Sequence, residues 1–350
     1  MAPVGQSIVA GRWGGDSAVS VEVELFDDLA AAEADAAGAL GRDAQPSLYD
    51  RLSWYRLLAE HVDLPSKPIV ARARHMQRRA WMFLATGERM ASAWASWYSL
   101  RWRPIGEPEL WPHILAAFRD GLVPELDLVP IEDPAPVVKA CRESGWIPFV
   151  EEAKANWIAD TTDMDFDTYW AKRPSKLRNS AKRKAKAAGL DIAIHRSFDD
   201  AAWADYEAVY AASWKPEEGS MAFLRALAEQ EGAAGTLRLG VAKKDGKPLA
   251  AQLWLIENGE ATIHKLAYRE DAKALSPGTI LSMAMFRSAL DEDRVARIDY
   301  GTGDEPYKAD WMDERRMLWR VRAYNRRTLT GLFKAARRKA SSLVARRVSR

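Results

Sequence analysis

The stretch from Gly259 to Lys308 most constrains the fold, because signals for a strand, a helix and a second strand follow one another there. Residues 261–268 are rich in β-branched, apolar and aromatic side chains, and Asn258-Gly259 before them is a strong signal for a two-residue hairpin turn. Upstream, residues 236–243 and 248–257 have the same character and flank a Lys-Asp-Gly-Lys turn. The three segments predict a three-stranded meander.

A helix is predicted directly after the meander. Ser276 can cap its N-terminus, Pro277 suits its first position, and residues 280–290 supply the helix itself. Residues 296–300 then form a strand that closes a βαβ unit and should run parallel to the third strand of the meander. Orphan N–H groups and the positive dipole at the helix start would suit an anion, and Gly278 leaves room for a phosphate. A helix cap that binds nothing fits the same residues.

Length and composition predict a globular protein with two domains, because 350 residues with 48% hydrophobic content can bury two cores. The single cysteine, Cys141, excludes an intramolecular disulfide and a multi-cysteine zinc site, which fits a reducing compartment; no metal site is expected. The first residues do not have the pattern of a signal peptide, and no segment reaches the roughly 18 to 20 apolar residues that span a bilayer. We therefore expect a cytoplasmic protein, with peripheral attachment to the inner membrane left open.

Charge is distributed unevenly although the net charge is only +2. Residues 315–350 contain 13 Lys/Arg and no Asp/Glu, which leaves −11 on the other 314 residues. Apolar residues recur there at helical spacing, as in an amphipathic helix that lies on a membrane surface: Leu329, Leu332, Phe333, Ala336, Ala340, Leu343 and Val344. The alternatives are that this stripe docks on the protein's own body, or that the basic tail binds nucleic acid or only water.

Two other segments have more than one interpretation. Residues 171–188 hold eight Lys/Arg and no acid, a helix whose charges would suit CoA phosphates, an acidic carrier protein, lipid headgroups, RNA or water. Two or three strands are expected over residues 69–103, and we consider residues 90–103, in a tryptophan-rich stretch, as one of them. On it Trp94 would share a face with other aromatic rings and Trp97 would take the opposite face. These rings fit either a packed core or an apolar groove for an acyl chain.

The order of meander, crossover helix and parallel strand, with Pro-Gly at the helix start, resembles the acyl-CoA half of the GNAT acyltransferase fold. More specifically it is similar to the CelD-like branch, which is related to the FemAB family of tandem GNAT proteins. The resemblance covers residues 169–311 through YWAKRPSKLRNSAKRKAKAAGL, SWKPEEGS, KDGKPLAAQLWL, ALSPGTILSMAM and DYGTGDEPYKADW. It implies an α/β (α+β) fold of two GNAT copies, each a mixed, mainly antiparallel sheet flanked by helices.

The domains implied are a degenerate copy at residues 1–158, an acyl-CoA-binding copy at 159–325 and a basic amphipathic tail at 326–350. No covalently bound cofactor is expected, and acyl-CoA or an acyl carrier protein is the co-substrate. The resemblance places the thioester between the ends of strands 261–268 and 296–300. The residues expected to contact the donor are Leu266, Ala267, Tyr268, Leu275, Ser276, Gly278 and Thr279.

Aminolysis of a thioester needs a held amine, a proton acceptor and a donor to the leaving thiolate. His264 is a possible base because an imidazole titrates near neutrality, although a structural histidine is an alternative. The resemblance nominates Tyr307 as the proton donor to sulfur. Asp304 would hold the amine or act as the base, and Lys308 would contact a phosphate or the thioester oxygen. Further substrate contacts are expected from Trp214, Asp299, Trp94 and Trp97.

The sequence therefore predicts an N-acyltransferase that moves an acyl group from acyl-CoA to a primary amine. A long-chain amino base at the membrane surface is the first acceptor considered, because bacterial ceramide synthases resemble GNAT proteins of this sort, and this would place the protein in sphingolipid metabolism. The alternatives are an envelope polysaccharide or amino sugar, and a FemAB-like transfer from aminoacyl-tRNA. A nucleic-acid partner is not expected, because aromatic residues are sparse in the basic segments.

Overall fold

The computed structural model describes residues 8–13, 20–63 and 66–348, and of residues 8–13 and 342–348 it describes the backbone alone. The chain divides into two compact units: unit 1 is Met1–Lys154 with Met317–Arg350, and unit 2 is Ala155–Arg316. Strands β8 (Trp146–Asp160) and β14 (Glu314–Asn325) each contain residues of both units. Residues 317–325, which the sequence placed in the C-terminal domain, thus belong to unit 1.

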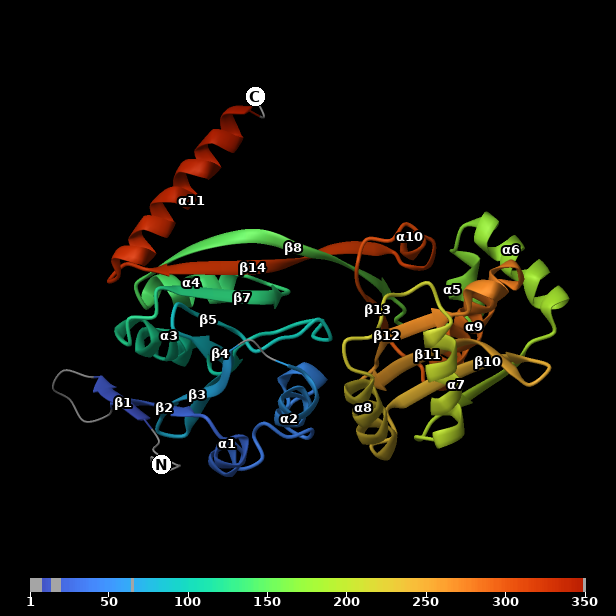
Figure 1. Ribbon diagram of the computed structural model, residues 1–350, viewed down its shortest axis with the longest axis horizontal. Helices are drawn as coiled ribbons and strands as arrows, with labels where there is room; N and C mark the ends of the chain where they lie inside the picture. The colour runs from blue at the N-terminus through green and yellow to red at the C-terminus, as the bar shows by residue number, and fades with distance from the viewer. Residues whose placement is uncertain (1–7, 14–19, 64–65, 349–350) are drawn as a thin grey trace. The chain divides into compact units, whose positions relative to one another are not determined.

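Unit 1 is a sheet with strand order β1-β2-β3-β4-β5-β7-β14-β8, in which β5 and β7 pair in parallel (Figure 1). Its apolar core lies between this sheet and helices α3 and α4, which bury Ile114, Leu115 and Cys141. Its further strands are β1 (Ile8–Trp13), β2 (Val21–Phe26), β3 (Lys67–His75), β4 (Arg78–Gly87), β5 (Met90–Ala93), β6 (Ile105–Gly106) and β7 (Glu125–Ile131). Its helices are α1 (Leu29–Ala36), α2 (Leu52–His61), α3 (Trp111–Asp120), α4 (Ala135–Glu143) and α11 (Leu329–Val348).

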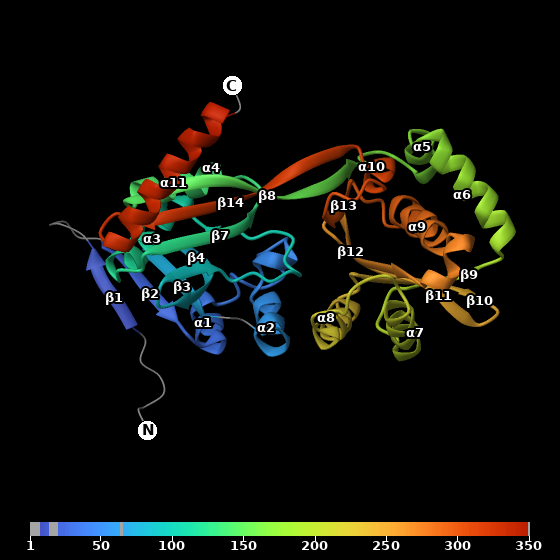
Figure 2. The same cartoon turned by 45° about the horizontal axis from the view of Figure 1, so that its top comes forward.

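The sheet strands of unit 2 have the order β8-β13-β12-β11-β10-β9. Figure 2 shows α7 and α8 on one face of this sheet and α5, α6 and α9 on the other. The strands are β9 (Asp191–His195), β10 (Leu237–Lys244), β11 (Lys247–Glu257), β12 (Glu260–Tyr268) and β13 (Arg297–Thr302). The helices are α5 (Phe166–Ala171), α6 (Ser175–Ala188), α7 (Asp200–Ala211), α8 (Met221–Ala233), α9 (Pro277–Arg287) and α10 (Lys308–Trp311).

The predicted meander and βαβ unit are confirmed. Strands β10, β11 and β12 pair antiparallel in sequence order, and β12 pairs in parallel with β13 across α9. Asn258 and Gly259 have φ of 50° and 75°, the positive values that a tight hairpin turn of this type requires. The fold that local sequence signals predicted for residues 236–302 is therefore the fold the chain adopts.

Strands β12 and β13 pair over only three residues each. Glu260, Ala261 and Thr262 lie opposite residues 297–299, and no later residue of β12 has a partner on β13. A bulge also interrupts the ladder between β12 and β11, because the register passes from Trp254 opposite Ile263 to Leu253 opposite Lys265 and skips His264. Beyond Thr262 the two strands are thus unpaired, and a gap opens at their carboxyl ends.

Two predicted elements are wrong in extent. The strand predicted over residues 90–103 ends at Ala93, because the chain then turns into irregular structure in which Trp102 donates its indole N–H to the Phe83 carbonyl at 2.9 Å. The helix predicted over residues 171–188 begins only at Ser175. Pro174 separates it from α5, since the residue before a proline avoids the helical conformation.

Trp94 is a core residue of unit 1. The prediction that it contacts substrate is therefore wrong. Its side chain is 1% exposed and packs against Tyr55 and Phe83, at ring-centroid distances of 5.3 and 6.3 Å. Trp94→Ala should therefore lower the free energy of unfolding by about 3 to 5 kcal/mol, measured by chemical denaturation. Trp97→Ala is the matched control, because Trp97 is 58% exposed and its loss should cost less than about 0.5 kcal/mol. Equal effects of the two substitutions would contradict this assignment.

Candidate active site

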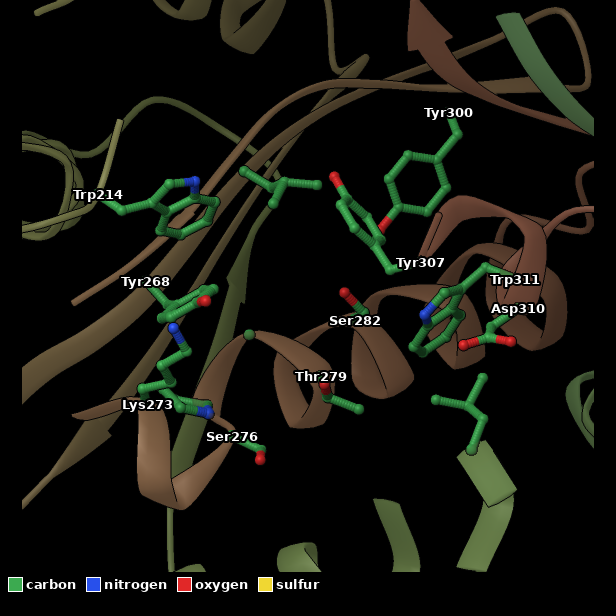
Figure 3. A pocket seen from close by; sticks show the side chains of 14 residues that line it. Trp214, Tyr268, Lys273, Ser276, Thr279, Ser282, Tyr300, Tyr307, Asp310 and Trp311 are labelled. Atoms are coloured by element: carbon green, nitrogen blue, oxygen red, sulfur yellow. The ribbon is translucent and has the colours of Figure 1, made fainter. Parts of the chain in front are cut away.

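A cavity of about 450 Å³ lies in unit 2 at the gap between β12 and β13. Strand β12 contributes Leu266 and Tyr268, β13 contributes Tyr300, and the first two turns of α9 form the floor (Figure 3). The complete lining is Leu177, Trp214, Leu266, Tyr268, Lys273, Ser276, Pro277, Gly278, Thr279, Ser282, Tyr300, Tyr307, Asp310 and Trp311. The cavity lies where β12 and β13 are not hydrogen-bonded to each other. If the two strands were paired along their full length, they would leave no gap for it.

The start of α9 has the geometry of an anion site. Pro277 is the first helical residue, as predicted, and the Ile280 N–H is the first to bond back, to the Ser276 carbonyl at 3.2 Å. The N–H groups of Gly278 and Thr279 therefore have no partner within the helix. Ser276 lies at the N-cap, but its φ of 54° is left-handed and its side chain does not cap, contrary to the prediction. The Ser276 side chain lines the cavity instead.

Gly278 packs against an aromatic ring of the sheet. A Cβ added at Gly278 would lie 3.0 Å from Cδ1 of Tyr268, so a larger residue there would push that ring. The other side of Tyr268 faces Trp214, with ring centroids 4.3 Å apart. Tyr268 is thus held between the α9 backbone and the loop that carries Trp214, and the three together form one end of the cavity (Figure 3).

Tyr300 and Tyr307 form the opposite side of the cavity, with ring centroids 5.9 Å apart (Figure 3). Desolvation, and secondarily the carboxylate of Glu305, raise the pKa of Tyr307. Desolvation also raises the pKa of Tyr300 well above its usual value. Both phenols therefore remain protonated across the physiological pH range and can donate hydrogen bonds into the cavity.

A buried polar chain fixes the floor of the cavity. Trp254 donates its indole N–H to Gln252 at 2.9 Å, and the amide of Gln252 donates to Ser282 Oγ at 2.8 Å and to the Gly278 carbonyl at 3.3 Å. Gln252 is 1% exposed. Its two donated bonds tie the first turns of α9 to the centre of the sheet, which holds the anion site in a fixed place.

Of the residues predicted to contact the donor, five line the cavity: Leu266, Tyr268, Ser276, Gly278 and Thr279. Ala267 does not, because it follows Leu266 on a strand and points to the other face, where it is buried. Leu275 is likewise absent from the lining. Trp214, predicted as a substrate contact, lines the cavity and is 46% exposed.

His264 lies outside the cavity, contrary to its predicted role. Burial lowers the pKa of His264 to about 3, and the nearby Lys265 ammonium adds to this effect. The predicted alternation placed Thr262, His264 and Leu266 on one face, but the bulge at His264 puts Thr262 and Leu266 on opposite faces. An imidazole with so low a pKa is a weak base near neutrality. The structure therefore contradicts the prediction that His264 is the general base.

Three other predicted residues are engaged elsewhere and do not line the cavity. Asp304 forms a two-pronged ion pair with Arg315 at 2.7 and 2.9 Å, and this hydrogen bonding is the main cause of its lowered pKa. Lys308 is 3% exposed and donates to the Thr302 carbonyl at 2.7 Å, which pins the loop after β13. Asp299 accepts from Arg316 at 3.1 Å and from the Gly301 N–H at 2.8 Å. These contacts give all three a structural role.

Trp97 is not among the residues that line the cavity. It belongs to unit 1, where its ring meets Tyr98 edge-on at a centroid distance of 6.1 Å. Together with the burial of Trp94, this means that neither of the predicted tryptophans of the N-terminal half lines the cavity.

The sequence prediction missed several lining residues. Ser282 could have been found, because it lies three residues after Thr279 on the same face of the predicted helix. Leu177 comes from α6, whose Lys184 donates to the Ala274 carbonyl just before α9. Tyr300, Lys273, Asp310 and Trp311 carry no sequence signal that separates them from ordinary strand and loop residues.

Comparison with known proteins identifies the fold. Residues 171–309 match the family model of the acetyltransferase (GNAT) domain. A search of curated proteins finds no match to this chain. Among solved structures, FemX is similar with a TM-score of 0.51 and 9% identity, covering 76% of this chain and 94% of that one. A conserved protein of unknown function from Bacteroides thetaiotaomicron has a TM-score of 0.55 and 13% identity, covering 86% and 99%.

A third similar structure is the C-terminal domain of a proposed lysylphosphatidylglycerol synthetase from Agrobacterium fabrum. Its TM-score is 0.50 with 17% identity, and the match covers 72% of this chain and 83% of that domain. These likenesses agree with the expected fold of mixed, mainly antiparallel sheets flanked by helices. The chain therefore has the GNAT fold and carries a GNAT acetyltransferase domain over residues 171–309, and by class it is an acyltransferase enzyme.

Proposed function

We propose that unit 2 transfers an acyl group from acyl-CoA to a primary amine. The observation that carries the proposal is the gap between β12 and β13, which joins the open start of α9 to the phenol of Tyr307 in one cavity. Phosphates of the donor would meet the N–H groups of Gly278 and Thr279, with Ser276 and Lys273 beside them. The edge of β12 beyond Thr262 would hold the extended part of the donor as an added strand does.

The chain's own residues then have separate tasks. The amine nitrogen attacks the thioester carbonyl, a C–N bond forms, and the C–S bond breaks as the electron pair leaves on sulfur. The phenol O–H of Tyr307 stabilises that sulfur by hydrogen bonding and can supply its proton. The amine loses one proton to water in the same reaction, and a Tyr307 that has given its proton to sulfur regains one from water.

We place a lipid-like acceptor first, with a long-chain amino base of the sphingoid type as the specific candidate. In support of this acceptor, α11 extends away from the sheet of unit 1 (Figure 1). Several apolar side chains of α11 are exposed. Leu329 and Phe333 are 87% and 69% exposed, while Gly331 and Ala335 face the body of unit 1. Membrane attachment would be peripheral, since no helix among the described residues has the length and apolar character to cross a bilayer.

A transfer from an aminoacyl donor is the second candidate. The Agrobacterium fabrum domain belongs to a protein named for a lysyl-modified phospholipid. FemX, another of the similar structures, fits the alternative of a FemAB-like transfer from aminoacyl-tRNA. Helix α6 offers exposed cations that have no ion pair among the described residues: Lys176, Lys182, Arg183 and Lys186. They would suit the phosphates of a tRNA as well as those of CoA. An envelope polysaccharide or amino sugar is a third acceptor class.

Release of free thiol from acetyl-CoA and from long-chain acyl-CoA tests the proposal. Each donor is offered with a long-chain amino base, with an amino sugar and with no acceptor. Thiol release that requires both a long acyl chain and the amino base supports the lipid acceptor. Release with the amino sugar supports the third class. No release with any pair, and no CoA binding, would reject acyl-CoA as donor and favour the aminoacyl route.

Attachment to an anionic membrane is tested separately through α11. Replacing Leu329 and Phe333 together by Ser should reduce co-sedimentation with phosphatidylglycerol vesicles by about tenfold or more, because both apolar contacts with the bilayer are lost. Leu122→Ser is the matched control, since Leu122 is 60% exposed elsewhere on unit 1. Raising the salt concentration should weaken binding as well. Binding that is equal for both proteins would reject α11 as the attachment surface.

A further inference from the structure

The loop between α7 and α8 lies along the part of β12 that has no partner on β13. Ser213 forms an isolated antiparallel bridge with Arg269, and the Glu270 N–H donates to the Ala212 carbonyl at 3.1 Å. Next in the loop, Trp214 packs on Tyr268 and lines the cavity. The residues that follow Trp214 are therefore placed at the gap in which acyl transfer is proposed.

A group of charged side chains lies on the face of β12 opposite the cavity. Leu266 points toward α9 and the cavity, so its neighbour Lys265 points to the face covered by α7 and α8. There Lys265 forms an ion pair with Glu218 of the loop at 3.0 Å, and their side chains are only 11% and 2% exposed. The gap thus has an apolar and hydroxyl-lined side and a charged side.

Two further charged residues, Lys308 and Glu305, interact electrostatically with Lys215 of the loop, and the five groups together hold one more cation than anion. Lys308 pairs with Glu305 at 3.1 Å, as Lys265 pairs with Glu218. Lys215 is the fifth charged residue of this group, and its charge interacts with those of the two lysines and two glutamates just named. Its ammonium lies 5.9 Å from the Trp214 ring centroid and forms no ion pair with any described residue. The three lysines and two glutamates together carry a net charge of +1.

We infer that Lys215 binds an acid group, a carboxylate or phosphate, that the acceptor carries next to its amine. This inference rests on the proposed amine acylation and names the class of acceptor. An acceptor that carries only an ammonium would add a positive charge to a partly buried site that is already cationic. A carboxylate or phosphate on the acceptor would instead neutralise the unpaired ammonium of Lys215. It concerns the polar head of the acceptor, whether or not an alkyl chain is attached. It favours an amino lipid or amino acid that bears an acid group over the plain amino base placed first above.

The protonation of Lys215 gives the inference a pH signature. Burial, and then the charge of Lys265, lower the pKa of Lys215 to about 8, against the opposing effect of Glu218 and Glu305. Below that pH the side chain is a cation that can bind an anion, and above it the side chain is increasingly neutral. The KM for an acid-bearing amine should therefore rise as the pH increases through about 8, while the KM for a plain amine should not follow this curve.

The test compares amines that differ only in the acid group: serine, ethanolamine and O-phosphoethanolamine. Thiol release from acyl-CoA and calorimetric binding in the presence of CoA are measured for the full chain. We expect serine or O-phosphoethanolamine to bind at least about tenfold more tightly than ethanolamine, and the preferred acid shows which group the site takes. Lys215→Met should abolish the preference and Lys215→Arg should retain part of it. Lys247→Met, at the exposed first residue of β11, is the control and should leave it unchanged.

Equal binding of the three amines, or a preference that survives in Lys215→Met, would overturn the inference. Selective binding without thiol release from any amine would support Lys215 as the anion site and reject the proposed reaction. Thiol release without any selectivity among the three amines would support the proposed reaction and reject Lys215 as the anion site. The two proposals therefore fail in different ways.

Discussion

Tyr307→Phe is expected to lower kcat for acyl transfer by about 10² to 10³, the cost of removing one hydrogen-bond donor to a developing negative charge. The KM for acyl-CoA should change little, because the ring that lines the cavity remains. Stability should also hold, since the hydroxyl belongs to a side chain that is 41% exposed. Steady-state thiol release and thermal denaturation measure the two effects.

Tyr300→Phe is the control for this prediction. Its ring lies 5.9 Å from that of Tyr307 and lines the same cavity, but Tyr300 is only 5% exposed and packs beside Ser282. We expect a smaller loss of kcat from Tyr300→Phe. If Tyr300→Phe removed the activity and Tyr307→Phe did not, the donor to the leaving sulfur would be Tyr300, and the role predicted for Tyr307 would be wrong.

Thr279→Glu is expected to weaken CoA binding by at least about tenfold, or about 1.4 kcal/mol, because it places a carboxylate where the donor phosphates would meet the start of α9. The same substitution should not destabilise the helix, since an acidic side chain in the first turn interacts favourably with the helix dipole. Calorimetric titration with CoA, paired with a denaturation curve, separates loss of binding from loss of folding.

Thr279→Val is the matched control because it keeps the size and shape of the side chain without its hydroxyl or any charge. We expect CoA binding to change by less than about threefold, which corresponds to the weak net contribution of one hydrogen bond. Unchanged CoA binding in Thr279→Glu would show that the donor phosphates do not lie at α9. Equal losses in both variants would assign the effect to the hydroxyl instead of to the charge.

Unit 2 was predictable because its signals are local. The Asn258-Gly259 turn, the alternating strands and the Pro277 helix start each depend on a few neighbouring residues, and together they predicted the meander and the parallel strand. The long strand over residues 90–103 failed because its aromatic residues looked like strand residues but are buried by an irregular chain path. Periodicity alone does not separate these two ways of burying a tryptophan.

The candidate site was predictable only in part. Ser276, Gly278 and Thr279 followed from the helix start, which the sequence marks directly. His264 failed because a single bulge reverses which face each later residue of β12 occupies, and nothing local in the sequence marks the bulge. Asp304 lies in the predicted polar loop and Lys308 begins α10 directly after it, but their partners, Arg315 and the Thr302 carbonyl, were not evident from their positions in the chain.

By itself, the sequence determined the order of strands and helix in unit 2, the position of the α9 N-terminus and the basic amphipathic character of the tail. Only the tertiary structure decided where β12 and β13 part, which face of β12 lines the cavity, and which charged side chains are already paired. The physical reason is range: turns and caps are set by neighbouring residues, whereas burial, pairing and pKa depend on groups that are far apart in the chain and meet only when it folds.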